Sequence, residues 1–256
     1  MPWYKNTSIW SAIIAVIAIF LSQLPPIKNW IPNDNLTLKY GDRITVNNAI
    51  GLTGYHVNLG LNNDGNTSLK IESIALAVKG PSGVEKRYIA ETLSTPTAGG
   101  GFLNLPVTSL SLKQKESWSG SVFFNRKVSP SEEEKFNEVR LKVSQNISDK
   151  IQLQNWGDYN PRALVSADAE IVEEAAITFN ENFDLQKGLH EAKIEIKLRG
   201  KEDLIIESLE YTLYDYHFSQ IMAQVEDYKY GYGIYLPHLP NKTVSVKVRP
   251  RQGAGY

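Results

Sequence analysis

Tyrosines cluster near the end of the chain and are the residues best suited to bind a partner. Between residues 211 and 235 stand Tyr211, Tyr214, Tyr216, Tyr228, Tyr230, Tyr232 and Tyr235. A tyrosine ring offers a large, rigid contact area with a polar tip, which suits protein interfaces and stacking on sugars alike. An extended conformation of residues 228–233 would place three phenols on one face, and the glycines between them favour close approach of another backbone. We therefore predict binding at Tyr228, Tyr230, Tyr232 and Tyr235; the alternative is that these aromatic residues only fill the sheet.

Catalytic motifs are missing from the sequence. It contains no Gly-x-Ser-x-Gly elbow, no Ser-x-x-Lys pair, no phosphate-binding loop and no His-Glu-x-x-His segment. Because there is no cysteine, thiol nucleophiles and thiolate metal sites are excluded. Asp215, His217 and His238 are the nearest approach to a metal site, but imidazoles on strands usually only form hydrogen bonds. We expect a protein that is not an enzyme and holds no metal or other cofactor.

After residue 36, apolar and polar residues alternate along much of the chain. This pattern predicts that the secondary structure of this part is mainly β-strand. In residues 55–62 every odd position is apolar or aromatic, which predicts a strand with one buried face and an exposed His56. The same alternation marks Ala192 to Leu198 and Val244 to Val248. His190 is expected to cap the core of the second of two modules.

Residues 129–153 are expected to contain a short helix followed by two strands. Ser129, Pro130 and Glu132 form a strong helix start. Val139, Leu141 and Val143 then alternate with polar residues, which predicts a strand, a turn at 146–149 and a return strand at 150–153. A helical turn leading into a last hairpin is typical of an immunoglobulin-like sandwich.

An internal similarity suggests that the β module occurs twice. At a constant offset, Gly65, Leu69, Ile71, Glu72 and Ser73 match Gly200, Leu204, Ile206, Glu207 and Ser208. Chance similarity of two amphipathic hairpins is the alternative. We predict a single transmembrane helix followed by two tandem immunoglobulin-like β-sandwich domains. The expected boundaries are 1–32 for the anchor and flank, 33–155 for the first domain, 156–162 for the linker and 163–256 for the second domain.

The stretch from Ile9 to Leu24 carries no charge and ends at Pro25. A helix from Ser8 to Leu24 would reach roughly 25 Å, slightly short of the ~30 Å hydrocarbon core of a bilayer. A cleaved signal peptide is the alternative, but residues 20–25 offer no Ala-x-Ala cleavage site. We predict a membrane anchor made by Ile9, Trp10, Ile13, Ile14, Val16, Ile17, Ile19, Phe20 and Leu21.

The basic residues around this helix suggest its orientation. Lys5 and the α-amino group precede the helix, and Lys28 is the nearest cation after it. We therefore expect a single-pass protein of the inner (plasma) membrane, with a cytoplasmic N-terminus and the bulk of the chain periplasmic or extracytoplasmic.

Net charge narrows the possible partners. A formal charge of −1 and a pI near 6.5 lack the basic footprint of a nucleic-acid-binding protein. With the membrane helix, the sequence predicts a non-enzymatic accessory or scaffold protein that contacts the lipid bilayer and other proteins in a membrane-associated assembly. The alternative is a membrane-tethered module that binds a saccharide or another envelope polymer.

Overall fold

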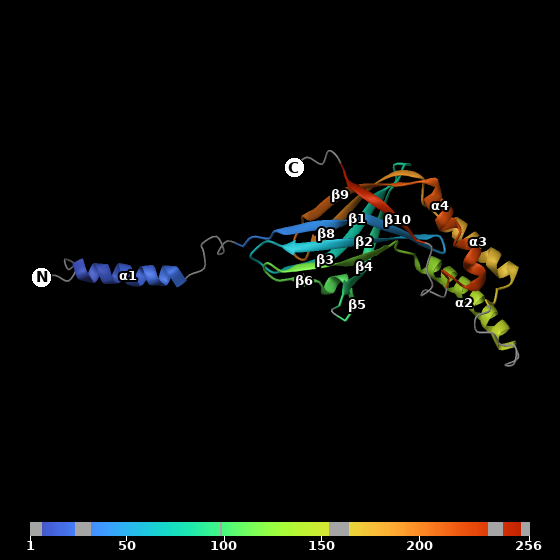
Figure 1. Ribbon diagram of the computed structural model, residues 1–256, viewed down its shortest axis with the longest axis horizontal. Coiled ribbons are helices and arrows are strands. Elements are labelled where there is room, and N and C mark those ends of the chain that lie inside the picture. Colours follow the sequence, from blue (N-terminus) through green and yellow to red (C-terminus); the bar gives the residue numbers. More distant parts are fainter. Residues whose placement is uncertain (1–6, 24–31, 98, 154–163, 235–242, 252–256) are drawn as a thin grey trace.

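Eight antiparallel strands close into one barrel at the centre of the molecule (Figure 1). This computed structural model describes residues 7–23, 32–97, 99–153, 164–234 and 243–251. Its strands are β1 (Leu36–Ala49), β2 (Leu52–Asn63), β3 (Leu69–Lys79), β4 (Glu85–Pro96), β5 (Phe102–Pro106), β6 (Ser111–Leu112), β7 (Ser117–Asn125), β8 (Gly188–Leu198), β9 (Leu204–Leu213) and β10 (Val244–Pro250). Its helices are α1 (Thr7–Gln23), α2 (Pro130–Leu153), α3 (Ala169–Asn182) and α4 (Asp215–Met222), with 3-10 helices η3 (Val107–Ser109) and η4 (Val225–Tyr230).

The strand order shows how the barrel closes. It runs β4-β7-β2-β1-β10-β9-β8-β3, and β3 pairs again with β4. Strand β4 is long enough to pair with both of these strands. Its first part pairs with β3, with Ile89 opposite Ala75, and its second part pairs with β7, with Leu93 opposite Val122. Strand β5 pairs with the end of β4, and the short β6 pairs with the start of β3.

The mainly β content is confirmed, but the prediction of two tandem immunoglobulin-like sandwiches is wrong. Strands from the two predicted domains are neighbours in one sheet. Strand β1 pairs with β10, with Arg43 opposite Lys247, and β3 pairs with β8, with Leu76 opposite Ile194. Contacts between residues so far apart in the chain leave no pattern in the local sequence. The linker predicted at residues 156–162 lies outside the described residues.

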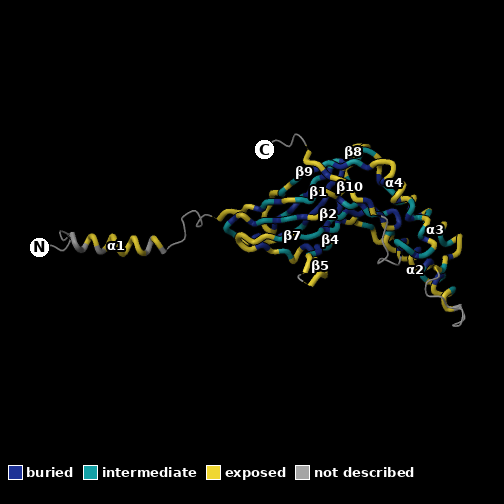
Figure 2. The backbone as a smooth tube through the Cα atoms, in the orientation of Figure 1, coloured by how far each residue is buried: buried dark blue, intermediate teal, exposed yellow. Residues whose placement is uncertain are grey.

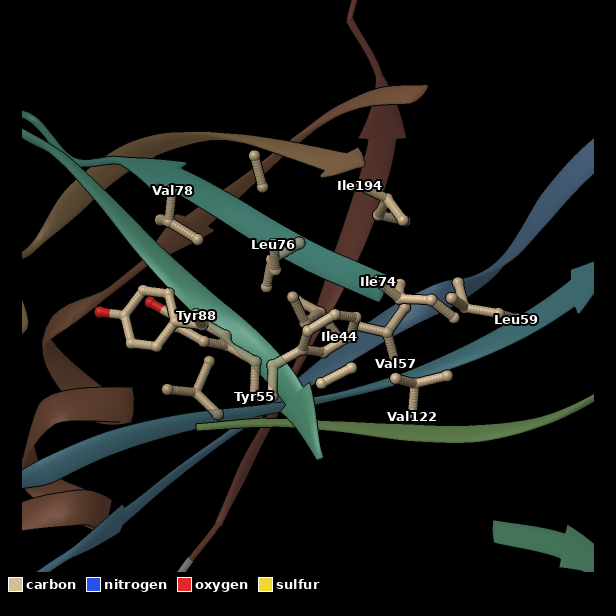
Figure 3. Packing of buried hydrophobic residues seen from close by; sticks show 14 of the residues in the cluster. Ile44, Tyr55, Val57, Leu59, Ile74, Leu76, Val78, Tyr88, Val122 and Ile194 are labelled. Atoms are coloured by element: carbon tan, nitrogen blue, oxygen red, sulfur yellow. The ribbon is translucent and has the colours of Figure 1, made fainter. Parts of the chain in front are cut away.

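The barrel core consists of the inward-facing members of each alternating strand. In β2 the odd positions from Tyr55 to Leu61 are buried, as their alternation predicted, and β8 and β10 follow the same rule. Figure 3 shows these side chains meeting inside the barrel, among them Ile44, Leu76 and Ile194. Each of these three is fully buried. Burying such a side chain contributes roughly 1.5–3 kcal/mol, so the closed barrel is the main source of stability.

The predicted internal repeat is wrong. The two matched segments have different connections, since β8 pairs with β9 whereas β2 and β3 are not neighbours in the sheet. The matched side chains also face opposite ways: Ile71 is fully buried, but Ile206 is 50% exposed. The similarity therefore arises from two amphipathic segments and not from a duplicated module.

Helix α2 occupies the whole of Pro130–Leu153, so the strands predicted at 139–143 and 150–153 are wrong. Its predicted start is confirmed: Ser129 Oγ accepts a bond from the Glu132 amide, and the Ser129 amide donates to the Glu132 carboxylate at 2.7 Å. The buried residues are Phe136, Val139, Val143 and Ile147. This spacing belongs to a helix, and Leu141, which suggested the strand, lies exposed on the other side.

Helices α2 and α3 form an antiparallel arm at one end of the barrel (Figure 1). Ion pairs join them along their length, from Lys135–Glu181 through Lys142–Glu174 to Lys150–Asp168. The turn between β1 and β2 reaches this arm, because Gly51 lies directly against the backbone of α3. The arm is thereby packed against the barrel.

The prediction of a single-pass membrane anchor is wrong. Helix α1 has 17 residues, and no helix among the described residues is long and apolar enough to cross a membrane. The predicted inner-membrane location with a cytoplasmic N-terminus is therefore unsupported. The residues assigned to that anchor all lie on α1: Ile9, Trp10, Ile13, Ile14, Val16, Ile17, Ile19, Phe20 and Leu21.

Candidate binding groove

A hollow of about 250 Å³ lies where β1, β10 and β9 meet the start of α4. We call it the basic–aromatic groove. It is lined by Arg43, Leu189, Glu210, Tyr211, Thr212, Tyr214, Tyr216, His217, Ser245, Val246, Lys247 and Arg249. Side chains of alternate residues point outward from a barrel, so the outer faces of three strands supply the floor. The groove therefore combines residues that are far apart in the sequence.

Three cations line this groove. Strand register places Arg43 directly opposite Lys247, and Arg249 follows two residues later on the same face of β10. Among the described residues, no acidic side chain lies within ion-pair distance of Arg43, Lys247 or Arg249. Glu210 stands opposite Arg249 in the sheet, but its nearest ion-pair partner is Arg251 at 3.9 Å. The groove therefore has positive charge available for a ligand.

Arg43 is held in place by its neighbour on β10. Its Nε donates to Ser245 Oγ at 2.8 Å, and a terminal nitrogen donates to the Ser245 carbonyl oxygen at 2.5 Å. These bonds fix the planar guanidinium while the other N–H donors remain available. A fixed guanidinium can bind a carboxylate or phosphate through two parallel hydrogen bonds.

Two exposed tyrosines border the cations. Tyr214 and Tyr216 are 55% and 64% exposed, and their ring centres lie 5.9 Å apart at an angle of 13°. His217 fixes this segment, because its Nδ1 accepts a hydrogen bond from the Tyr214 amide at 3.1 Å. Burial lowers the pKa of His217, and the nearby charge of Arg43 lowers it further. Neutral His217 thus keeps the acceptor that holds the aromatic pair.

The predicted tyrosine site has a different structure from the one expected. Residues 225–230 form the 3-10 helix η4, so the extended conformation considered for residues 228–233 does not occur at residues 228–230. Tyr228 is fully buried, and its ring meets Phe179 edge-on at 6.1 Å. Tyr230 and Tyr232 are half-buried neighbours at 5.9 Å, and Tyr235 lies outside the described residues. Binding by Tyr230, Tyr232 and Tyr235 stays a prediction, while Tyr228 belongs to the core.

The remaining histidines have structural surroundings. His56, predicted to be exposed, is half-buried and stacks on Phe123 with ring centres 4.4 Å apart. Asp215 and His217, considered for a metal site, serve other contacts: Asp215 pairs with Lys187 at 2.5 Å. His238 lies outside the described residues. In the part of the chain that the structure describes, no group of three or more potential metal ligands lies together.

A polar cluster lies inside the barrel, near the end that meets the helices. The Tyr211 hydroxyl donates to the Tyr55 hydroxyl at 3.1 Å, and Tyr88 meets Tyr55 edge-on at 4.7 Å. Burial raises the pKa of all three phenols, so they stay neutral. His190 stacks on Tyr211 with ring centres 4.9 Å apart, and burial lowers the pKa of His190.

Beside this cluster, the Asp184 carboxylate accepts hydrogen bonds from Lys86 and Thr53. The associated hollow of about 30 Å³ has room for little more than one water.

We expect acid to destabilise the fold partly through His190. Its folded pKa lies below the ordinary 6.5, so the unfolded chain binds more protons as the pH falls. The stability that neutral His190 contributes is complete above pH 6.5. It is lost as the pH falls through the pKa that His190 has in the folded protein. His190→Phe keeps a ring against Tyr211 but cannot titrate. Urea midpoints between pH 7.5 and 5 should therefore fall less for the variant than for the unmodified chain. A difference between the two proteins that is the same at every pH would contradict this.

Comparisons with known proteins add no family assignment. No protein-family model matches the chain, and no curated protein matches it.

Proposed function

We propose that this chain is a non-enzymatic binding protein that mediates protein–protein contact, and that the basic–aromatic groove receives an acidic segment of the partner. The observation that carries the proposal is the set of three cations, Arg43, Lys247 and Arg249, which lack acidic partners among the described residues. Like-charged side chains on neighbouring strands repel each other. An acidic ligand would relieve that repulsion.

The aromatic border of the groove supports a peptide ligand. Tyr214 and Tyr216 offer large exposed rings, and Leu189, 53% exposed, adds an apolar surface. Tyrosine and arginine are enriched among the residues that dominate protein interfaces. The combination fits a segment in which carboxylates alternate with apolar side chains, so that the carboxylates meet the cations and the apolar groups meet the rings.

Reversing the charge of the groove tests the proposal. The probe is a fluorescent peptide of alternating glutamate and leucine, and binding to the full chain is followed by anisotropy. The variant carries Arg43→Glu, Lys247→Glu and Arg249→Glu. We expect at least about a tenfold loss of affinity, because each ion pair adds modestly and repulsion replaces attraction. Binding by the unmodified chain should also weaken as salt is added.

A matched control separates the groove from the overall charge. The side chains of Lys70, Lys79 and Lys113 are exposed and form no ion pair among the described residues. Changing all three to Glu alters the net charge by the same amount and should leave affinity within about twofold, since distant exposed charges are screened. Equal losses in the two triple variants, or no binding of the peptide by the unmodified chain, would refute the assignment.

An acidic saccharide is the second candidate ligand. It is favoured by one observation, the nearly parallel exposed rings of Tyr214 and Tyr216, on which sugar rings can stack. Oligogalacturonate is the probe for this case, with Tyr214→Ala plus Tyr216→Ala as the variant. Saccharide binding that depends on both tyrosines, without binding of the acidic peptide, would replace the protein partner by a carbohydrate one.

A further inference from the structure

Strand β5 is an apolar strand at the open edge of the sheet. It is paired with β4 on one side, and in the described residues no strand lies on its other side. All its residues are exposed, with Phe102 at 70%, Leu103 at 50% and Leu105 at 39%. Figure 2 shows β5 as an exposed segment that projects from the barrel. Most proteins shorten, charge or cover such an edge, because it pairs readily with other strands.

Charge does not protect this edge. From Thr92 to Leu112 the sequence contains no Asp, Glu, Lys or Arg. This run covers the end of β4, the turn and the whole of β5. Within this run a second copy of the chain therefore meets no like charge, in contrast to the charged outer faces of β8 and β9. Only Pro106, which has no backbone N–H, limits pairing at the end of the strand.

The direction of the backbone groups on β5 follows from its turn. The Thr97 amide donates to the Gly101 carbonyl oxygen at 2.8 Å, which makes this a hydrogen-bonded pair. In antiparallel pairing such pairs alternate with non-bonded ones, so Leu103 and Leu105 bond to β4. The N–H and C=O groups of Phe102 and Asn104 consequently point away from β4, toward the open edge.

We propose that two copies of this chain associate by antiparallel pairing of β5 with β5. A two-fold axis at Leu103 places Phe102 of each copy opposite Asn104 of the other. All the outward groups of Phe102 and Asn104 then find partners, because both residues present N–H and C=O to the edge. Leu103 meets its own counterpart, and Leu105 lies opposite the small Gly101. The pairing is closed, since each copy contributes the same edge to a two-fold contact.

The expected dimer is weak. A strand of this length buries less surface than a standard interface of about 1,600 Å², so association in the micromolar to millimolar range is expected. Sedimentation velocity of the full chain over that range should show a monomer–dimer equilibrium. A chain that stays monomeric at every concentration would refute the proposal.

Single cysteines test the register. The chain contains no cysteine, so one introduced thiol reports one contact. Opposed Cα atoms in a non-hydrogen-bonded pair lie about 4.5 Å apart, which permits a disulfide. Leu103→Cys should therefore form a covalent dimer under mild oxidation. Two control variants should each give at least about tenfold less covalent dimer than Leu103→Cys. They are Leu105→Cys, on the same face of the same strand, and Val84→Cys, at a site outside β5 that is 57% exposed. Equal cross-linking by the three variants would contradict the two-fold pairing.

A proline substitution tests the backbone contact itself. Asn104→Pro removes an N–H that points away from β4, so the β4–β5 pairing keeps its bonds. Its control, Asn104→Ala, loses the same side chain but keeps the N–H. We expect dimerisation of the proline variant to be weakened at least about tenfold relative to the alanine variant, while their urea midpoints agree. Unchanged dimerisation of Asn104→Pro would rule out pairing through this edge.

Discussion

Replacing Gly51 with alanine is expected to lower the free energy of unfolding by about 2–4 kcal/mol. Two effects combine at this position. Gly51 has a φ of +88°, a conformation that L side chains rarely adopt. An added Cβ would also lie 2.4 Å from the Phe179 carbonyl oxygen and 2.7 Å from Asn182 Cβ, both on α3. Helix α3 would have to move away from the barrel to admit the methyl group.

Gly200→Ala is the matched control for this prediction. Gly200 has a similar φ of +77°, but nothing lies within 4 Å of its added Cβ. Gly200→Ala therefore introduces the backbone strain without the steric clash, and it should lower the free energy of unfolding by only about 1 kcal/mol. Urea unfolding of both variants provides the comparison. Equal losses would show that α3 does not rest on this turn as closely as the structure indicates.

The sequence predicts the strands well because their signal is local. Tyr55, Val57 and Leu59 alternate with polar residues, and that pattern alone requires one buried face. Barrel closure has no such signal, since Arg43 meets Lys247 only after the whole chain has folded. The α2 error has a related cause. A spacing of four residues, as between Val139 and Val143, fits the two-residue repeat of a strand and the 3.6-residue repeat of a helix. Only the exposure of Leu141 shows that the helical repeat applies.

The candidate site was only partly predictable for the same reason. The abundance of tyrosine drew attention to residues 211–235, but the orientation of each side chain depends on the structure. Tyr211 points into the barrel and Tyr228 into the core, whereas Tyr214 and Tyr216 at the start of α4 are exposed. The cations were missed because Arg43 comes from the first strand. In the sequence, Lys247 and Arg249 belong to a short basic end, a pattern more typical of a solvated tail than of a binding patch.

Barrel closure makes a second strong prediction, on two core residues that are far apart in the sequence. Leu76 on β3 and Ile194 on β8 are direct cross-strand neighbours, and both are fully buried. Leu76→Ala should cost about 2–5 kcal/mol, and Ile194→Val about 0.5–1.5 kcal/mol. Because the two side chains are cross-strand neighbours in the same core, we expect a coupling of at least about 0.5 kcal/mol in the double variant. Urea unfolding should show a single transition that shifts in every variant.

Val143 on α2 supplies the control for this comparison of single and double variants. It is fully buried, but it lies in the helical arm, outside the barrel wall. Combining Val143→Ala with Leu76→Ala should give additive losses, since one site lies on α2 in the helical arm and the other on β3 in the barrel. Two independent domains would behave differently: Leu76 and Ile194 would then act on separate transitions, and their effects would add without coupling. Observing two transitions, one for each variant, would therefore exclude the closed barrel.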